Sequence, residues 1–285
     1  MDASSALPEQ TEAALGEALA QFLRRHRKVA VLSGAGVSTA SGIPDYRDTD
    51  GQWKHSRPVM YEDFRRHAHI RRRYWARSLV GWEYFRRARP NTAHAALATL
   101  ENAGHVRGLV TQNVDRLHQQ AGHREVLDLH GRLDQVFCLD CGEVSEREEM
   151  QLRLQAANPV FEGRADSTRP DGDAELAQAG IEDTFEVPGC RRCGGMLKPA
   201  VVFFGEGVPR DWVRQATAHI DEADALLVVG SSLMVFSGFR FARHAAKSGK
   251  PVAILGLGRT RADELASLRL AGDCGGVLNA ALGTL

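Results

Sequence analysis

The chain has 285 residues, of which 43% are hydrophobic and 25% charged, values that are ordinary for a folded globular protein. Lys plus Arg and Asp plus Glu each total 36, so the formal net charge of zero gives no electrostatic argument for binding nucleic acid or a membrane. No apolar run approaches the roughly 20 residues of a membrane span, and the acidic N-terminal stretch lacks a secretory-signal pattern. We therefore expect a cytoplasmic protein with neither nucleic acid nor membrane as a partner, in an oligomeric state that the sequence does not indicate.

The pattern of apolar residues predicts an α/β fold. Near the N-terminus, Leu15, Leu19 and Phe22 recur at the spacing of an amphipathic helix. Four short apolar, β-branched runs further along are typical of buried parallel strands, with helical segments between them. This alternation predicts a parallel sheet covered by helices on both faces. The strands are expected at 28–32, 106–111, 225–230 and 251–255, and the helices at 93–103, 209–222 and 237–248.

Two segments interrupt the alternation of strands and helices. Residues 57–89 are rich in arginine and aromatic residues and are expected to be helical, whereas residues 136–197 contain two cysteine pairs and a long loop with little periodicity. Neither segment is large enough to bury a core of its own, so we expect both to form one small domain on the sheet domain. The sheet domain then comprises residues 1–56, 90–135 and 198–285.

A glycine turn follows the first predicted strand, in the stretch GAGVSTASGIPDYR (34–47). A helix beginning at Ser38 or Thr39 would direct backbone N–H groups at a pyrophosphate, as nucleotide-binding turns do. However, Thr39 stands where a dehydrogenase fingerprint has its third glycine, and the next acids, Asp48 and Asp50, lie in a loop instead of following a second strand. The turn therefore indicates a nucleotide ligand but not a standard hydride-transfer enzyme.

A second polar segment, TQNVDRLHQQAG (111–122), follows the second predicted strand. Gln112, Asn113 and Asp115 would lie at the carboxyl end of the sheet, where open α/β sheets bind ligands. The same residues fit the start of a helix, with Asn113 as its N-cap and Asp115 favoured by the helix dipole. The spacing alone favours neither interpretation.

His130 lies in the sequence LHG (129–131), shortly before the first cysteine pair. A single histidine is more often structural than catalytic, but this one adjoins a loop rich in ligand-type residues. An imidazole close to its usual pKa suits a general base near neutral pH. We therefore treat His130 as a candidate base.

Four of the five cysteines form two C-x2-C pairs with 48 residues between them. In a reducing compartment this spacing indicates a metal before a disulfide, and four thiolates form a closed tetrahedral zinc site, which is structural. A redox dithiol is the alternative, but such motifs come singly. A glycine after each pair, Gly142 or Gly194, lets the chain turn so that backbone amides face the thiolates. The predicted ligands are Cys138, Cys141, Cys190 and Cys193.

Two later segments, KPAVVFFGE (198–206) and GSSLMV (230–235), fit core strands followed by turns. In a functional interpretation, the small residues 230–232 receive a ribose or phosphate and the two segments present strand edges to an extended peptide. Six arginines between residues 65 and 77 fit a solvated helix face better than the alternative, which is recognition of an anionic acyl group or partner.

Together these motifs resemble those of the sirtuin family. The motifs named above, with VVGSSL (228–233), occur in the family's order and span about residues 30–280. Tyr46, the SSLMVFSGFRF phrasing (231–241) and the long loop between the cysteine pairs are similar to the class II branch. The resemblance implies a Rossmann-like parallel sheet domain, a smaller zinc-ribbon and helical lobe, NAD as a consumed co-substrate and one structural Zn²⁺.

The resemblance also implies roles for individual residues. His130 and Asn113 are implied to be catalytic, and Asp45 to hold the nicotinamide carboxamide. One departure is Gly256, where sirtuins commonly have an Asn that contacts the adenosine ribose, so we expect NAD binding weaker by about 0.5–1.5 kcal/mol. The residues implied to bind NAD are Gly34, Ala35, Gly36, Ser38, Ile43, Pro44, Asp45, Tyr46, Arg47, Trp53, Gln112, Asn113, Val114, Asp115, His130, Gly230, Ser231, Ser232, Gly256, Leu257 and Cys274. Those implied to bind an acyl-lysine protein or peptide are Val202, Phe203, Gly205, Glu206, Leu233 and Val235.

The activity implied by the resemblance is NAD-dependent protein-lysine deacylation. The acyl oxygen attacks the ribose as nicotinamide leaves, His130 removes a proton from the ribose hydroxyls, and lysine, nicotinamide and O-acyl-ADP-ribose are released. Three alternatives stay open: mono-ADP-ribosylation of a protein, removal of long or lipoyl acyl groups shaped by the loop 158–187, and a non-enzymatic NAD-binding zinc scaffold. Tyr74 and Arg77, in a YxxR arrangement, would favour acidic acyl groups if they face the pocket.

Overall fold

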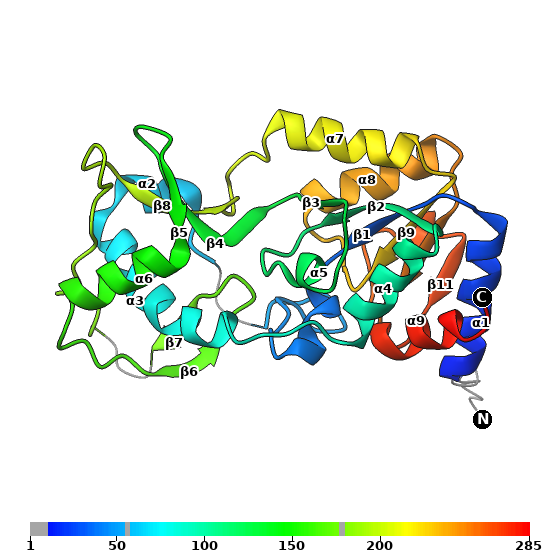
Figure 1. The fold of residues 1–285 in the computed structure, drawn as a ribbon, viewed down its shortest axis with the longest axis horizontal. Coiled ribbons are helices and arrows are strands. Elements are labelled where there is room, and N and C mark those ends of the chain that lie inside the picture. The colour runs from blue at the N-terminus through cyan, green and yellow to red at the C-terminus, as the bar shows by residue number, and fades with distance from the viewer. Residues whose placement is uncertain (1–10, 55–57, 177–179) are drawn as a thin grey trace, which may run out of the picture.

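The computed structural model describes residues 11–54, 58–176 and 180–285, with only the backbone given for residues 166–168. The expected limit between residues 56 and 57, and part of the loop 158–187, lie outside the described residues. Figure 1 shows two lobes side by side along the longest axis of the molecule, with the sheet lobe holding the C-terminus. In the part of the chain that is described, no helix is both long and apolar enough to cross a membrane.

A six-stranded parallel sheet forms the larger lobe, with the strand order β11–β10–β9–β1–β2–β3. Strand β1 is flanked by β2 on one side and β9 on the other, so the strand order reverses at β1. This is the order of a Rossmann-like sheet, in which ligands bind at the carboxyl ends of the strands beside the reversal. The strands are β1 (Val29–Ser33), β2 (Val106–Thr111), β3 (Val126–Asp128), β9 (Ala225–Val229), β10 (Val252–Leu255) and β11 (Leu268–Leu270).

Helices cover both faces of this sheet, as the sequence predicted. The apolar stripe of α1 packs with α4 and α9 against one face, and α7 and α8 cover the other (Figure 1). Each face has its own buried cluster, because parallel strands are apolar on both sides. The helices are α1 (Glu12–Arg25), α4 (Thr92–Asn102), α5 (Leu117–Gln120), α7 (Arg210–Asp221), α8 (Phe236–Lys247) and α9 (Cys274–Leu282).

The structure differs from the sequence prediction at two places beside the sheet. No α-helix begins at Ser38 or Thr39; the chain forms two single 3-10 turns, Ala35–Val37 and Thr39–Ser41, and then leaves through Gly42 at φ +83°. Because a left-handed residue ends helical geometry, the glycine stops the helix that the spacing suggested. The segment 198–206 is a strand only as far as Val201, and its remainder is a turn.

The smaller lobe combines helices with a three-stranded antiparallel sheet of order β5–β4–β8 and a β6–β7 hairpin. Strand β4 begins at Gly131 and pairs with β8. The domain limits expected between residues 135 and 136 and between residues 197 and 198 therefore cut through, or lie at the edge of, strands of one sheet. The division into two domains remains a proposal. Domain limits near Gly131 and Val201 agree better with the strand pairing than the expected limits do. The elements are α2 (Tyr61–Arg66), α3 (Ala68–Phe85), β4 (Gly131–Cys138), β5 (Val144–Glu146), α6 (Arg147–Ala157), β6 (Ala165–Thr168), β7 (Ala174–Leu176) and β8 (Leu197–Val201).

We expect Leu97→Ala to destabilise the sheet lobe by about 2–5 kcal/mol, the usual cost of such a cavity in a core. Leu97 is fully buried in the cluster between α4 and the sheet. Urea unfolding followed by circular dichroism measures the loss. Leu152→Ala on α6 makes the same chemical change at a side chain that is 61% exposed, and should cost less than 1 kcal/mol. Equal losses in the two variants would contradict the packing described here.

Candidate active site

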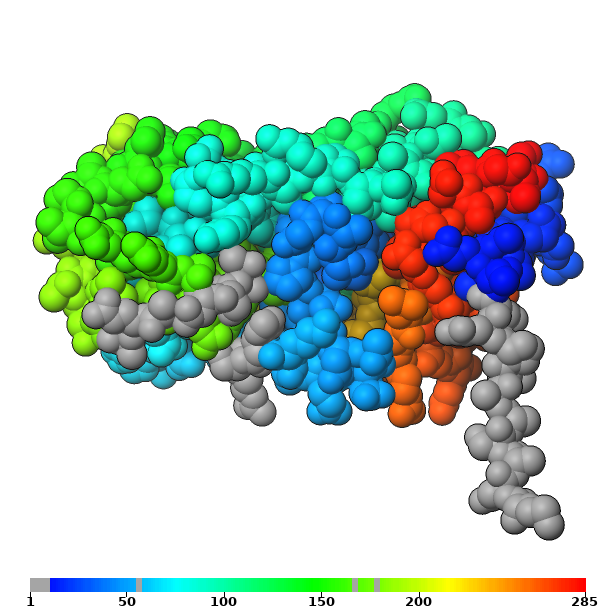
Figure 2. Space-filling model, turned by 90° about the horizontal axis from the view of Figure 1, so that it is seen from below, coloured from blue at the N-terminus to red at the C-terminus, as the bar shows by residue number. Residues whose placement is uncertain are grey.

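A cavity of about 680 Å³ opens at the carboxyl ends of β1, β2 and β9. This size is within the usual range for small-molecule and cofactor sites. Every residue predicted to contact NAD or the acyl-lysine substrate lines the cavity, with the exception of Pro44. Figure 2 shows the segment that follows β1 lying between the small lobe and the C-terminal part of the sheet lobe. The fold thus brings the predicted residues to one place, while their ligand contacts stay a prediction.

Close backbone packing sets the floor of the cavity. The N–H of Gly34 donates to the carbonyl of Val229 at 3.0 Å, and the N–H of Gly36 donates to that of Gly230 at 2.8 Å. Gly230 has φ +61°, and a Cβ there would lie 2.5 Å from the nitrogen of Val37. The turn therefore uses these two amides to join β1 to β9. These two amides are therefore not free to bind a ligand, and the binding of a pyrophosphate at this turn stays a prediction.

Gln112 and Asn113 join the ends of three strands through side-chain hydrogen bonds. The Gln112 amide donates to Ser231 Oγ at 2.7 Å, and the Asn113 amide donates to Gly34 O and Ser38 Oγ, both at 3.1 Å. Asn113 is 9% exposed, so these bonds are sheltered from water. It does not cap α5, so that alternative is wrong for Asn113. Its position beside the glycine turn matches the ligand-site interpretation.

Asp115 is a buried acid that supports the same turn. One carboxylate oxygen accepts a hydrogen bond from Ser38 Oγ at 2.6 Å and the other accepts from Leu117 N at 2.9 Å. Burial raises the pKa of Asp115, and the hydrogen bonds from Ser38 and Leu117 oppose that rise. The bond to Leu117 is the helix-start role that the sequence allowed. Asp115 thus fixes Ser38 and the first turn of α5 together.

His130 lies on the cavity wall with both ring nitrogens hydrogen-bonded. Its Nδ1 lies 3.0 Å from the carbonyl oxygen of Gln112, and its Nε2 lies 2.8 Å from Ser237 Oγ. Burial lowers the pKa of His130 to about 4, and the bond to Gln112 only partly offsets this. The imidazole is therefore neutral at physiological pH. The sequence expectation of a pKa near the usual value for histidine is wrong, because it could not include burial.

Two charged residues of the loop after the glycine turn already have partners within that loop. Asp45 pairs with Lys54 at 2.5 Å, while Arg47 donates to Gly51 O at 2.8 Å and lies 4.0 Å from the ring centre of Trp53. Both members of the Asp45–Lys54 pair are partly exposed, and exposed ion pairs contribute little to stability. A ligand group with a better hydrogen-bond fit can therefore displace Lys54 from Asp45 at low cost.

The turn after β8 is held by a partly buried acid. Glu206 accepts hydrogen bonds from Phe203 N at 2.8 Å and from Lys198 Nζ at 3.0 Å. Opposite this turn, Leu233 is buried at a left-handed φ of +54°, whereas Val235 is 39% exposed. Glu206 therefore shapes the turn, and the apolar side chains on both segments remain the ones that can contact a substrate.

The arginine of the YxxR arrangement is committed to a protein carboxylate. Arg77 Nε lies 3.2 Å from Asp173 Oδ1, and both side chains are largely buried. Tyr74, Asp171 and Asp173 line the cavity, whereas Arg77 does not. The charge of Arg77 is thus balanced inside the protein, which removes the expected support for acidic acyl groups.

Cys274 and Gly256 line the adenosine side predicted for the cavity. Burial raises the pKa of Cys274 to about 12, so its thiol is protonated and unreactive at neutral pH. Gly256 has φ +156°, a conformation that favours glycine. An Asn at this position would be strained in the backbone conformation seen here.

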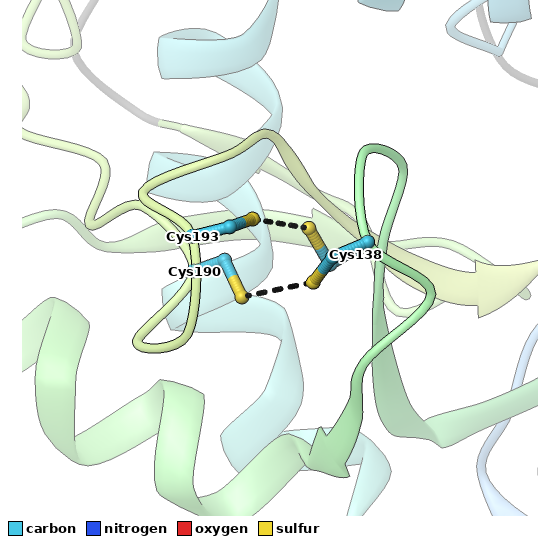
Figure 3. Close-up of side chains that lie close together, drawn as sticks. Cys138, Cys190 and Cys193 are labelled. Carbon is cyan, nitrogen blue, oxygen red and sulfur yellow. Dashed lines mark hydrogen bonds between the residues drawn. The ribbon is translucent and has the colours of Figure 1, made fainter.

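The four paired cysteines form one cluster in the small lobe. Figure 3 shows Cys190 and Cys193 on one loop facing Cys138. Cys138 Sγ lies 3.6 Å from Cys193 Sγ, Cys141 Sγ lies 3.8 Å from Cys190 Sγ, and all four sulfurs lie within 4.8 Å of one another. Tetrahedral Zn–S bonds of about 2.3 Å place sulfurs about 3.8 Å apart, so the cluster fits Zn²⁺.

The glycines after the two cysteine pairs adopt the expected turns. Gly142 and Gly194 have φ of +76° and +73°, and the N–H of Gly195 donates to Cys193 Sγ at 3.4 Å. An amide that donates to a thiolate stabilises its negative charge and orients it toward a metal. The zinc would hold β4 to the loop before β8, and it has no open position for chemistry.

Sequence reasoning missed Ser237, the hydroxyl that contacts His130. Ser237 lies in the first turn of α8, and its partner is 107 residues away in the chain. The available signal was weak: a single polar side chain, next to a glycine, where a helix begins after a strand end. It also missed the Asp45–Lys54 pair and the acids Asp171 and Asp173 at the cavity wall.

Comparison with known proteins gives consistent results. A family model described as the Sir2 family matches residues 34–237. The chain is 55% identical over 258 residues to NAD-dependent protein deacetylase 2 of Bradyrhizobium diazoefficiens, covering 90% of this chain and 94% of that protein. It is 48% identical over 263 residues to the human NAD-dependent protein lipoamidase sirtuin-4, mitochondrial, covering 91% of this chain and 83% of that protein. A solved structure described as "Sir2-p53 peptide-NAD+" is 29% identical, with a TM-score of 0.76 and coverage of 94% of this chain and 97% of that one.

We expect Cys141→Ser to lose bound zinc and to lower the melting temperature, because a closed thiolate site contributes its metal-binding free energy to folding. Zinc content by plasma emission spectroscopy and thermal unfolding measure the two effects. Cys274→Ser is the matched control: its thiol is buried but lies outside the cluster, so this variant should keep one zinc per chain. Full zinc content in the Cys141 variant would contradict the assignment of this ligand.

Proposed function

This chain belongs to the Sir2 family, the sirtuins, and we propose that it is an NAD-dependent protein-lysine deacylase that acts as a deacetylase. It transfers the acyl group of a modified lysine to ADP-ribose and releases nicotinamide and O-acyl-ADP-ribose. The observation that carries this proposal is a neutral, hydrogen-bonded His130 at the point where β1, β2 and β9 end in one cavity. The names of relatives at about 55% identity support the same activity.

The proposed roles of the residues follow from what each side chain can do. Neutral His130 accepts a proton from a ribose hydroxyl, which makes the oxygen a stronger nucleophile. Asn113, whose amide nitrogen donates to Gly34 O and Ser38 Oγ, lines the same cavity as the base and would orient the ribose there. Asp45 accepts the N–H groups of the nicotinamide carboxamide after Lys54 has moved away. Zn²⁺ supplies no chemistry in this scheme and stabilises the small lobe.

The proposed acyl-lysine channel lies between the turn after β8 and the segment that leads into α8. Phe203, Leu233 and Val235 give it apolar walls, which suit the lysine stem and a neutral acyl group. Because Arg77 is paired with Asp173, acetyl is favoured over acidic acyl groups. Mono-ADP-ribosylation is not favoured, since relatives across this whole length are named deacetylases.

We also propose a cytoplasmic location. Four of the five thiols form a metal cluster, and free thiols persist in a reducing compartment.

Product analysis tests the proposed function directly. The protein is incubated with NAD and a panel of peptides that carry acetyl-, glutaryl- or lipoyl-lysine, and products are identified by mass spectrometry. We expect O-acetyl-ADP-ribose in amounts equal to the nicotinamide released. ADP-ribose attached to protein, without O-acyl-ADP-ribose, would show that the transfer goes to a side chain instead.

We expect His130→Ala to lower the deacetylation rate by about 10²–10⁴-fold, the usual contribution of a general base. Incorporation of labelled nicotinamide into NAD should persist, because in the proposed mechanism nicotinamide leaves before the base acts. His69→Ala on α3 removes an exposed imidazole that does not line the cavity and serves as the control. Deacetylation near the wild-type rate in the His130 variant would contradict the assignment of the base.

The pKa of His130 predicts an unusual pH dependence. Protonation of the imidazole blocks proton acceptance, so the rate falls as the pH drops through its pKa. Because burial lowers this pKa to about 4, kcat/KM should stay nearly constant from pH 8 down to about 5.5. A histidine at its ordinary pKa would halve kcat/KM near pH 6.5. The measurement uses saturating peptide and limiting NAD, with folding at each pH checked by circular dichroism.

A further inference from the structure

The hydroxyl of Ser237 forms a hydrogen bond with Nε2 of His130, the ring nitrogen that would accept a proton in the proposed reaction. Ser237 is the second residue of α8 and lines the cavity, and its Oγ lies 2.8 Å from Nε2 of His130. The described hydrogen bonds of the His130 side chain comprise this contact and the one between Nδ1 and the carbonyl of Gln112. A backbone carbonyl cannot donate, so the bond to Gln112 requires a proton on Nδ1.

This assignment fixes the direction of the second hydrogen bond. A neutral imidazole carries one proton, and with that proton on Nδ1 the nitrogen Nε2 has a free electron pair. Ser237 Oγ therefore donates its proton to Nε2. The structure thus shows the base in the tautomer that can accept a proton at Nε2, with a serine hydroxyl where a substrate hydroxyl would donate.

The first turn of α8 is tied to the same strand end as the ring. A Cβ on Gly238 would lie 2.3 Å from the side-chain oxygen of Gln112, so the helix backbone packs directly against Gln112. The carbonyl of Gln112 holds Nδ1 of His130, and Ser237, next to Gly238, holds Nε2. Gln112, His130 and Ser237 therefore form a closed set of contacts that fixes the plane of the imidazole.

We propose that Ser237 is a positioning residue for His130: it holds the ring in the Nε2-accepting orientation before the ribose binds and stabilises the imidazolium after proton transfer. This inference rests on the proposed deacylase function. In the proton-transfer step, the O–H bond of a ribose hydroxyl breaks and an Nε2–H bond forms, while Ser237 keeps its own proton. The serine hydroxyl rotates, because it can accept as well as donate, and accepts from the new Nε2–H.

Ser237→Ala tests the proposal through two reactions of one enzyme. Hydrogen bonds to charged groups are the stronger ones, so we expect the deacetylation kcat to fall about 10- to 100-fold. Exchange of labelled nicotinamide into NAD, measured with acetyl-peptide present, should stay within about twofold of wild type, because it precedes the action of the base. Ser237→Thr keeps a hydroxyl and should retain most of the deacetylation rate. Ser248→Ala, an exposed serine at the other end of α8, is the matched control.

The outcomes separate this inference from the proposed function. A wild-type protein with neither deacetylation nor exchange would overturn the proposed function itself. An active wild type with an unchanged Ser237→Ala rate, or with equal losses of exchange and deacetylation, would overturn the positioning role alone. A folded Ser237→Thr variant that loses as much as Ser237→Ala would do the same, since it would show that the hydroxyl is not what matters.

Discussion

The close contact of two backbone turns at the reversal of the sheet is the constraint on which the site depends. Gly36 donates to Gly230, and a side chain at position 230 would collide with Val37. Since both turns follow neighbouring parallel strands, their approach brings the ends of β1 and β9 within one hydrogen bond of each other. Gln112 and Asn113 then extend this contact to β2. A single rigid edge thereby carries the polar groups from three strands.

This rigid edge explains how the proposed base, His130, can be buried and still accept a proton. Burial costs the charged imidazole more than the neutral one, so the ring stays in its proton-accepting form far below neutral pH. A lower pKa also makes a weaker base, and the site must compensate by orientation and by stabilising the cation when it forms. The carbonyl of Gln112 orients the ring by its hydrogen bond with Nδ1. The hydroxyl of Ser237 can donate to Nε2 of the neutral ring and accept from Nε2–H of the imidazolium, so it is a hydrogen-bond partner in both protonation states.

The sequence predicted the elements and motifs that depend on local pattern, and missed features that depend on distant contacts. The central strands and the cysteine cluster were predicted because apolar runs and C-x2-C spacing are local signals. Strands β3 and β11 have three residues each, too few for a pattern. The helix expected at Ser38 fails because Gly42 ends it. The pKa of His130 and its contact with Ser237 arise only when α8 packs against the end of β2.

The zinc cluster and the active site are the two ends of one antiparallel pair of strands. At one end of the β4–β8 pair, Cys138 lies opposite Leu197, and at the other end Gly131 lies opposite Val201. Gly131 follows the base directly, and the N–H of Val202 donates to the carbonyl of His130 at 2.8 Å. The ladder is irregular between Gly131 and Val136, so a metal bound by the four cysteines would fix the register only of the segment from Val136 to Cys138. The proposed base and the proposed substrate turn are instead held together locally, by the Gly131–Val201 pairing and by the hydrogen bond from Val202 to the carbonyl of His130.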